Sequence, residues 1–238
     1  MHILMMAILG VLLAGCAATG PVREAQTQRP QQDVARDAGR KPFAVLDFLG
    51  VASGMTTLDL IASGGYYSEV LAQRVGPQGR VYAQNPAVAL RFYSGRNDRA
   101  LQARLAGARL PNVRRLDREF DDLGLRAGSV HVALTALNFH DVYNTSPAAA
   151  AAILQSVKSV LKPGGVLGII DHVGAVDADN KALHRIDPQL VIDAAQTAGF
   201  KVERSDLLAN PADDHTQAAF APSLRGQTDR FVLKLTRP

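Results

Sequence analysis

The chain has 238 residues, of which 47% are hydrophobic, with a formal net charge of +4, one cysteine and no tryptophan. A chain of this length and composition can bury one sizeable core, which excludes an intrinsically disordered protein. The single cysteine excludes an intramolecular disulfide, and no basic run is interleaved with aromatic residues, so we do not expect nucleic-acid binding.

The first sixteen residues are typical of an exported protein. Ile3–Ala14 is an apolar run of twelve residues, too short to span a bilayer, and small residues follow it before Cys16. This segment resembles a bacterial lipoprotein signal with its lipobox, although no Lys or Arg precedes the apolar run. The resemblance implies that residues 1–16 are a signal peptide and that Cys16 is lipidated. The protein would then be anchored to a membrane of the cell envelope and face the periplasm. The neutral Ala17 favours the outer membrane over the inner one.

The segment after the cysteine differs from the rest of the chain in composition. Residues 17–30 are rich in Gln, Arg, Ala and Pro, and we interpret them as a flexible tether. A helical pattern begins near Gln31, and Pro42–Phe48 predicts a further short helix. Residues 31–238 are therefore expected to form one folded domain.

Strand and helix patterns alternate through this domain. Strands are predicted at Thr57–Ile61, Arg80–Gln84, Val113–Leu116, Val130–Leu134, Val166–Ile170, Lys201–Asp206 and Arg230–Leu235. Helices are predicted at Tyr66–Val75, Ala87–Ala106, Pro147–Leu161 and Pro188–Ala198. This alternation indicates an α/β fold with a mostly parallel sheet covered on both faces. No helical pattern separates the last two strands, so the final strand is expected to be antiparallel.

The turn after the first strand is a candidate binding site. Ala62–Gly65 is a turn of small residues, and a helix pattern starts at Tyr66. Glycines let the backbone approach a ligand, and the N–H groups at a helix start point toward it. Tight strand-to-helix turns also need glycine for geometry alone, so both interpretations stay open.

Four motifs occur in order: DLIASGGYYSE, GRVYAQNP, LNFHDVY and LKPGGVLGIIDH. Together they resemble the class I S-adenosylmethionine-dependent methyltransferases, in particular a bacterial branch with a DLIPGGGY-type first motif. The resemblance extends from about Gln31 to Pro238. It implies a Rossmann-like fold with a seven-stranded, mostly parallel sheet and an antiparallel last strand. It also implies S-adenosyl-L-methionine as cofactor and a small-molecule methyl acceptor.

By this resemblance, the cofactor-binding residues lie at the ends of the first four strands. They are Asp59, Ser63, Gly64, Gly65, Asn85, Asp117, Leu134 and Asn138. Asp59 would orient the methionine amino group, Asn85 would bind the ribose hydroxyls, and Asp117 would face the adenine amino group. The turn residues would lie under the cofactor, and the two fourth-strand residues would flank its methionine portion.

The sequence departs from the family pattern at three positions. Ile61 and Ser63 occupy the first two glycine positions, and Asn85 stands where most of these enzymes keep a carboxylate. A neutral hydrogen bond in place of a charge-assisted one weakens ribose recognition by about 1–2 kcal/mol. The interpretation requires a cavity that reaches Asn85 and is not filled by Ile61 or by the tyrosines that follow the turn.

Most histidines are predicted to lie at one edge of the sheet. His140, His172, His184 and His215 follow strands, and the carboxyl ends of strands form the ligand crevice of an open α/β sheet. Aspartates accompany them at positions 141, 171, 213 and 214. His131 lies inside the fourth strand and is interpreted as a packing residue.

Three roles are open for this group. His140 with Asp141, or His172 with Asp171, can form a general-base pair that takes the proton of the acceptor, so His140, Asp141 and His172 are the predicted catalytic residues. His140, His172 and His215 with one Asp can instead bind zinc or iron. Ordinary structural hydrogen bonding is the third alternative.

A few further side chains have two interpretations each. Tyr66, Tyr67, Asn138, Tyr143 and Arg185 are candidates for lining the acceptor pocket. Arg185 can alternatively form a surface pair with Asp187. Arg225, Asp229 and Arg230, before the last strand, are expected to form a structural ion pair.

Export and cofactor lead to two functional hypotheses. S-adenosylmethionine is a cytoplasmic metabolite, whereas a lipoprotein folds outside the cytoplasm. The first hypothesis is an S-adenosylmethionine-dependent methyltransferase. The second is an exported binding or metal-dependent protein on a methyltransferase-like scaffold that no longer uses this cofactor.

Overall fold

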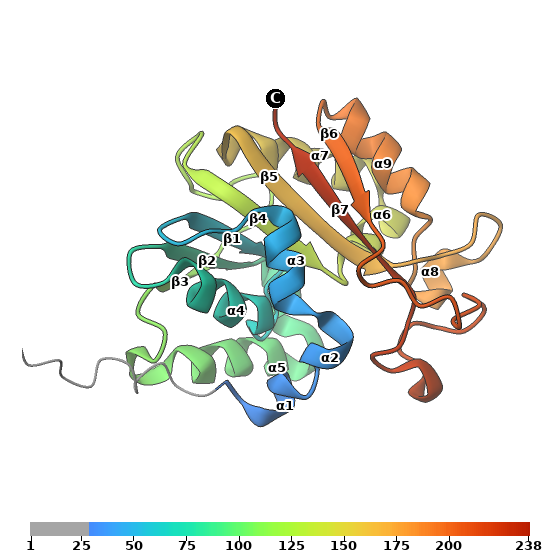
Figure 1. Cartoon of the computed structure of the whole chain (residues 1–238), viewed down its shortest axis with the longest axis horizontal. Helices are drawn as coiled ribbons and strands as arrows, with labels where there is room; N and C mark the ends of the chain where they lie inside the picture. The colour runs from blue at the N-terminus through green and yellow to red at the C-terminus, as the bar shows by residue number, and fades with distance from the viewer. Residues whose placement is uncertain (1–28) are drawn as a thin grey trace, which may run out of the picture.

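The computed structural model describes residues 29–238 (Figure 1). The predicted signal peptide, Cys16 and all but the end of the predicted tether lie outside the described residues. Within residues 29–238, no helix combines the length and the apolar character that a membrane span requires.

The described residues contain seven strands in one mixed sheet, with the order β3-β2-β1-β4-β5-β7-β6. The strands are β1 (Thr56–Leu60), β2 (Arg80–Asn85), β3 (Val113–Asp117), β4 (Val130–Ala136), β5 (Leu161–His172), β6 (Lys201–Ser205) and β7 (Arg230–Thr236). Neighbours from β3 to β5 are parallel, and β7 is antiparallel to both β5 and β6. The predicted seven-stranded, mostly parallel sheet with an antiparallel last strand is confirmed.

Helices cover both faces of the sheet (Figure 1). They are α1 (Gln31–Val34), α2 (Asp37–Arg40), α3 (Pro42–Leu49), α4 (Tyr66–Val75), α5 (Ala87–Leu105), α6 (Phe139–Thr145), α7 (Pro147–Val160), α8 (Asn180–Leu183) and α9 (Pro188–Thr197), with short 3-10 turns η1 (Ala106–Ala108) and η2 (Pro222–Leu224). One hydrophobic core contains residues of α6, α7 and α9, and a second contains residues of α3, α4 and α5.

Successive side chains of β1 point alternately to the two faces of the sheet. Leu58 and Leu60 are buried in the core with α7 and α9. Asp59, between them, points to the other face, where Ser68 of α4 donates a hydrogen bond to its carboxylate. The strand pattern therefore puts a carboxylate under the helix that follows the glycine turn.

The predicted helix at Ala87–Ala106 is interrupted. Phe92 to Gly95 have non-helical backbone angles, and Tyr93, Ser94 and Gly95 have φ values of 51°, 55° and 80°. Both Phe92 and Tyr93 are exposed, so no packing holds this part of the helix straight. The prediction of one continuous helix over Ala87–Ala106 is therefore wrong at the kink.

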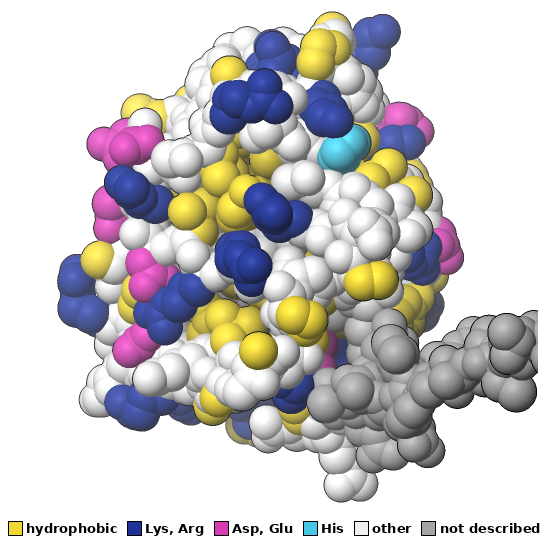
Figure 2. All heavy atoms as spheres, turned by 90° about the vertical axis from the view of Figure 1, so that its left-hand side faces the viewer, with side chains coloured by type: hydrophobic (Ala, Val, Ile, Leu, Met, Phe, Trp, Pro, Cys, Tyr) yellow, Lys and Arg dark blue, Asp and Glu magenta, His cyan; other side chains and the backbone are white. Residues whose placement is uncertain are grey.

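The face in Figure 2 is hydrophobic at its centre and carries charges of both signs. Lys and Arg side chains are spread singly over the visible surface, and Asp and Glu lie mainly along its margins.

Candidate active site

The turn after β1 keeps the backbone of a glycine-rich turn. Ile61, Ser63 and Gly65 have φ values of 56°, 52° and 82°. The left-handed region costs an L-residue roughly 1–2 kcal/mol, and a β-branched residue is rare there. Ile61 and Ser63 thus adopt a conformation that favours glycine, although neither residue is glycine.

The end of β2 holds this turn in place. Gln84 Oε1 accepts a hydrogen bond from the Ile61 N–H at 3.1 Å. Asn85 Oδ1 accepts one from the Ser63 N–H at 2.8 Å, and Asn85 Nδ2 donates to the Ser63 carbonyl at 3.2 Å. Both amide side chains are fully buried. The Asn85 amide is therefore occupied by the turn.

The second half of α5 covers the glycines. A Cβ added at Gly64 would lie 3.1 Å from that of Ala100, and one at Gly65 would lie 2.9 Å from Leu101 Cδ1. Arg104 Nε donates to the Gly64 carbonyl at 2.7 Å. The two glycines thus permit close helix packing, which is the geometric role that the sequence left open.

A pocket of about 350 Å³ opens at the carboxyl ends of β2 and β3, and none of the turn residues 61–65 lines it. Its lining consists of Ala87, Leu90, Asp117, Arg118, Glu119, Asp121 and Asp122. Asp117 is the sheet partner of Asn85, but Asn85 itself does not line the pocket. The expectation that this cavity reaches Asn85 is therefore wrong for the pocket that the described residues form. The volume is within the range of small-ligand sites.

Asp117, Glu119 and Asp122 of this pocket already have protein partners, Asp122 through the Gly124 N–H at 2.9 Å. Asp117 is bound by Arg115 Nε at 2.7 Å and remains exposed, and Glu119 Oε1 accepts a hydrogen bond from the Ala87 N–H at 2.9 Å. Asp117 and Glu119 both have acceptor capacity for donors such as the amino and hydroxyl groups of a nucleoside. The adenosine end of S-adenosylmethionine therefore fits this rim chemically, with Glu119 rather than Asn85 positioned as a partner for hydroxyl groups.

Asp59 is a buried carboxylate with one short side-chain partner. It is 3% exposed and accepts a hydrogen bond from Ser68 Oγ at 2.6 Å. Burial raises the pKa of Asp59 to about 7, against the opposing effect of the Ser68 hydrogen bond. A buried carboxylate of this kind complements a ligand ammonium, such as the methionine amino group.

The end of β4 closes this part of the site. Leu134 is the sheet partner of Asp59 and is fully buried. Asn138 Nδ2 donates to the carbonyls of Ile61 at 3.3 Å and Ala136 at 2.8 Å. Leu134 thus supports the site from beneath, and Asn138 ties the β4 loop to the glycine turn.

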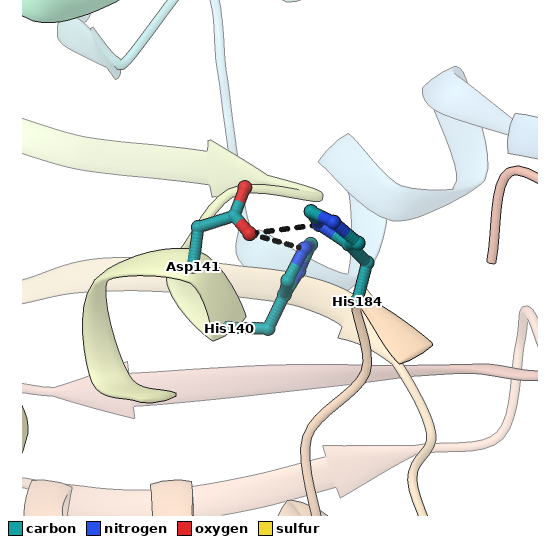
Figure 3. A group of neighbouring side chains, drawn as sticks. All are labelled: His140, Asp141 and His184. Carbon is teal, nitrogen blue, oxygen red and sulfur yellow. Dashed lines mark hydrogen bonds and ion pairs between the residues drawn. The ribbon is translucent and has the colours of Figure 1, made fainter. Parts of the chain in front are cut away.

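A histidine cluster lies at the carboxyl ends of β4 and β5 (Figure 3). Asp141 Oδ1 lies 3.2 Å from His140 Nε2 and 2.9 Å from His184 Nδ1. On the other side of the His140 ring, Nδ1 lies 2.6 Å from Asp171 Oδ1. One buried imidazole is thus held between two carboxylates.

Of the two predicted His–Asp pairs, the structure forms only His140–Asp141. Asp171 pairs with the His140 side chain and not with the ring of His172. His172 Nδ1 instead contacts Thr228 Oγ1 at 2.8 Å. Adjacent residues of a strand point to opposite faces, which explains why Asp171 and His172 do not pair through their side chains.

The two neighbouring rings have opposite pKa shifts. Burial lowers the pKa of His140, but the Asp171 and Asp141 carboxylates outweigh it and raise the pKa to about 10. Burial lowers the pKa of His172 to about 3, assisted by the positive charge of His140 and opposed by Asp171. Without a bound ligand or ion, His140 is a charged donor at neutral pH and His172 is neutral.

The predicted metal set of His140, His172 and His215 is not assembled. His215 Nε2 pairs with Asp229 at 3.0 Å. Within residues 29–238 the group whose ligand atoms all lie within 4.8 Å of one another is His140, Asp141 and His184. The sequence placed His184 at this edge but did not select it as a metal ligand.

Arg185 is a buried structural residue. It is fully buried and pairs with Asp213 at 2.9 Å, whereas Asp187 accepts a hydrogen bond from the Gln189 N–H at the start of α9. The expected Arg185–Asp187 surface pair is therefore wrong. Arg230 donates to the carbonyls of Gly39 and Gly226, and Asp229 pairs with His215 instead of an arginine.

No protein-family model matches the sequence, and no curated protein matches it. Solved structures do match. A SAM-dependent methyltransferase from Aquifex aeolicus has a TM-score of 0.62 at 21% identity over 89% of this chain and 100% of that chain. A chain from the complex of the Haloferax volcanii Trm112 methyltransferase activator with a putative methyltransferase has a TM-score of 0.61 at 19% identity, over 87% and 93% of the two chains.

The similarity also includes a protein named for another reaction. The [4+2]-cyclase SpnF has a TM-score of 0.62 at 15% identity, covering 84% of this chain and 81% of that one. At these identities the similarity establishes the fold and leaves the reaction to the site. The chain has the Rossmann-like fold of the S-adenosylmethionine-dependent methyltransferases, as its motifs predicted.

Proposed function

We propose that this protein is an S-adenosylmethionine-dependent methyltransferase that acts on a small acceptor. One observation carries the proposal: the end of β2 holds the left-handed turn after β1, and a ligand-sized pocket opens where β2 and β3 end. In an open α/β sheet this is the position where nucleotide-like ligands bind. The fold shared with methyltransferases supports the same conclusion.

The chain's residues would hold the cofactor in two halves. Asp117 and Glu119 would receive the adenosine end in the pocket, and Asp59 would receive the methionine amino group. Ser63, Gly64 and Gly65 would lie beneath the cofactor, with Leu134 and Asn138 beside its methionine portion. Bound S-adenosylmethionine supplies an electrophilic methyl group, and the protein's contribution is to position the acceptor and exclude water.

The acceptor would lie near the histidine cluster, beyond the end of β4. Asp141 contacts His184 Nδ1 and so orients the other ring nitrogen, Nε2, to take the proton from an acceptor O–H or N–H. His140 and His172 would shape the polar wall behind the acceptor. Their predicted catalytic role thus becomes one of positioning, and His184 joins Asp141 as the proton-accepting pair.

Calorimetric titration of the purified full chain with S-adenosylmethionine and S-adenosylhomocysteine tests the proposal. Ala87 is exposed on the pocket wall, so Ala87→Trp fills the pocket without disturbing the core. We expect the wild type to bind both ligands and Ala87→Trp to weaken binding at least tenfold. Val88→Trp, on the neighbouring exposed position outside the pocket, is the matched control. No binding by the wild type, or equal binding by Ala87→Trp, contradicts the proposal.

A protein that no longer uses S-adenosylmethionine is the second candidate. It is favoured by the occupation of Asn85 by the turn and by the packing of α5 on Gly64. Under this alternative the wild type binds neither S-adenosylmethionine nor S-adenosylhomocysteine in the titration.

The place of the protein in the cell envelope is a further part of the proposal. The apolar leader that ends at Cys16 supports export and lipidation at that residue, with anchoring in the outer membrane. An enzyme in this position would need the cofactor to reach the envelope. Fractionation of cells that express the full chain, with metabolic fatty-acid labelling, tests the location independently of the activity.

A further inference from the structure

His140, Asp141 and His184 bring three potential ligand atoms together (Figure 3). The Asp141 oxygen lies 3.2 Å from one ring nitrogen and 2.9 Å from the other. Atoms that bind one zinc-type ion at about 2.0–2.2 Å lie roughly 2.9–3.5 Å from each other. Two of the three spacings are therefore those of ligands around one ion, and the two ring nitrogens lie within 4.8 Å of each other.

We propose that these three residues bind a divalent transition-metal ion. Two histidines and one carboxylate are a donor set that suits zinc or ferrous iron. The site differs from the set of three histidines considered from the sequence, because His184 takes part and neither His172 nor His215 does.

The surroundings of His140 are those of a metal ligand. Asp171 holds Nδ1 of the ring, so Nε2 is directed at Asp141. Two backbone N–H groups, of His140 and His172, fix the Asp171 carboxylate at 2.7 and 2.8 Å. A carboxylate that orients a ligating imidazole from behind is a recurrent feature of protein metal sites.

The other two ligands lie at the surface. The side chains of Asp141 and His184 are 56% and 42% exposed, whereas that of His140 is 4% exposed. An ion bound by these three residues would keep open coordination positions toward solvent, as catalytic metal sites do. The centroids of the Phe220 and His184 rings lie 5.0 Å apart in an edge-to-face arrangement, so Phe220 lies beside the exposed side of the cluster.

Charge balance supports a cation at this point. Asp141 and Asp171 place two carboxylates around one buried ring. The nearby Arg185 is paired with Asp213 and does not neutralise them. A divalent ion would displace the protons shared by the rings and Asp141 and would balance both carboxylates.

Metal binding as such does not depend on methyl transfer, and only its role rests on the proposed function. In a methyltransferase, an acceptor hydroxyl at an open coordination position would lose its proton more readily, because the cation lowers its pKa. With Asp141 and His184 serving as metal ligands instead of as the proton-accepting pair, that proton would pass to solvent. The oxygen lone pair would form the new bond to the methyl carbon as the bond from that carbon to the sulfonium sulfur breaks, and S-adenosylhomocysteine would leave. In the alternative without S-adenosylmethionine, the metal itself would be the functional ligand.

The test is a titration of the chelator-treated full chain with Zn²⁺, followed by Co²⁺ and its visible absorption. We expect one equivalent of tightly bound metal in the wild type. Asp141→Asn and His184→Ala should each weaken binding at least tenfold, and both positions are exposed enough for the variants to fold. Asp171→Asn should weaken it 10–100-fold, as other orienting carboxylates do.

His215→Ala is the matched control, since His215 also pairs with an aspartate but lies outside the cluster. It should bind one equivalent like the wild type. Absence of stoichiometric binding, or equal losses in His215→Ala and His184→Ala, overturns the proposal. Titration of the same metal-free samples with S-adenosylmethionine tests the proposed function separately, so that either proposal can fail alone.

Discussion

Replacement of Asp59 by Asn should stabilise the protein at high pH and not at low pH. The Asp59 carboxyl is 3% exposed, and burial raises its pKa to about 7 from the ordinary 3.8. The pKa of Asp59 is thus about 3 units higher in the folded than in the unfolded state. The unfolding free energy is therefore about 4 kcal/mol lower when Asp59 is ionised than when it is protonated. The asparagine oxygen can still accept the Ser68 hydrogen bond, so the substitution removes mainly the charge.

The sign of the pH dependence follows from proton binding. The folded state holds the Asp59 proton more tightly than the unfolded state, so this group contributes stability fully below pH 3.8. That contribution is lost as the pH rises through about 7. Asp59→Asn does not titrate. Its unfolding free energy should therefore equal that of the wild type near pH 4 and exceed it near pH 8 by up to about 4 kcal/mol.

Urea unfolding of both full-length proteins, followed by circular dichroism from pH 4 to pH 8, measures this difference. Asp206→Asn is the control, because the Asp206 side chain is 78% exposed and its replacement should change stability by less than about 0.5 kcal/mol. All other titrating groups are common to the proteins and cancel. A difference between wild type and Asp59→Asn that does not vary with pH would refute the reasoning.

A buried carboxylate that lowers stability at neutral pH indicates a functional role. If the methionine ammonium binds at Asp59, the ionised form gains a partner. S-adenosylmethionine binding should then release protons near pH 6 in the wild type. Titrations in buffers of different ionisation enthalpy measure this release, and Asp59→Asn should abolish it.

Three further predictions concern the turn, the buried ion pair and the leader. Ser63→Val should be less stable than Ser63→Gly by about 1–2 kcal/mol in thermal unfolding, because a β-branched residue is strained at a left-handed φ; equal melting temperatures would contradict this. Arg185→Ala should lower the unfolding free energy by about 3–5 kcal/mol, since it leaves the buried Asp213 with only its two backbone N–H donors and no cationic partner; a loss below about 1 kcal/mol in urea unfolding would show that the pair is unimportant. Cys16→Ala should abolish fatty-acid labelling and move the protein from the membrane to the soluble fraction, and unchanged labelling would rule out lipidation at this residue.

The sequence predicted which segments are strands and that the sheet is mostly parallel, because the alternation of strand and helix patterns is local. The apolar run of β1 and the glycine turn after it specify a strand-to-helix connection without reference to the rest of the chain. The missing helix between β6 and β7 likewise indicated an antiparallel last strand. The carboxyl-edge position of His140 and His172 followed from the same strand assignments.

The partners of the site residues depend on contacts that the sequence does not encode locally. Asp171 pairs with His140 because successive side chains of β5 point to opposite faces, and a helix from another part of the chain supplies the ring. Asn85 holds the turn because β1 and β2 are neighbours in the sheet. The hydrogen bond between His184 and Asp141 joins residues that are 43 positions apart in the chain.

Local periodicity and turn chemistry thus determined the scaffold and the edge at which its reactive groups lie. Only the tertiary structure decided which carboxylate pairs with which imidazole ring, and which polar side chains form hydrogen bonds with the backbone. The physical reason is range: strand and helix patterns arise from residues a few positions apart. Hydrogen bonds between side chains require atoms within about 3 Å, a distance that only the packed chain fixes.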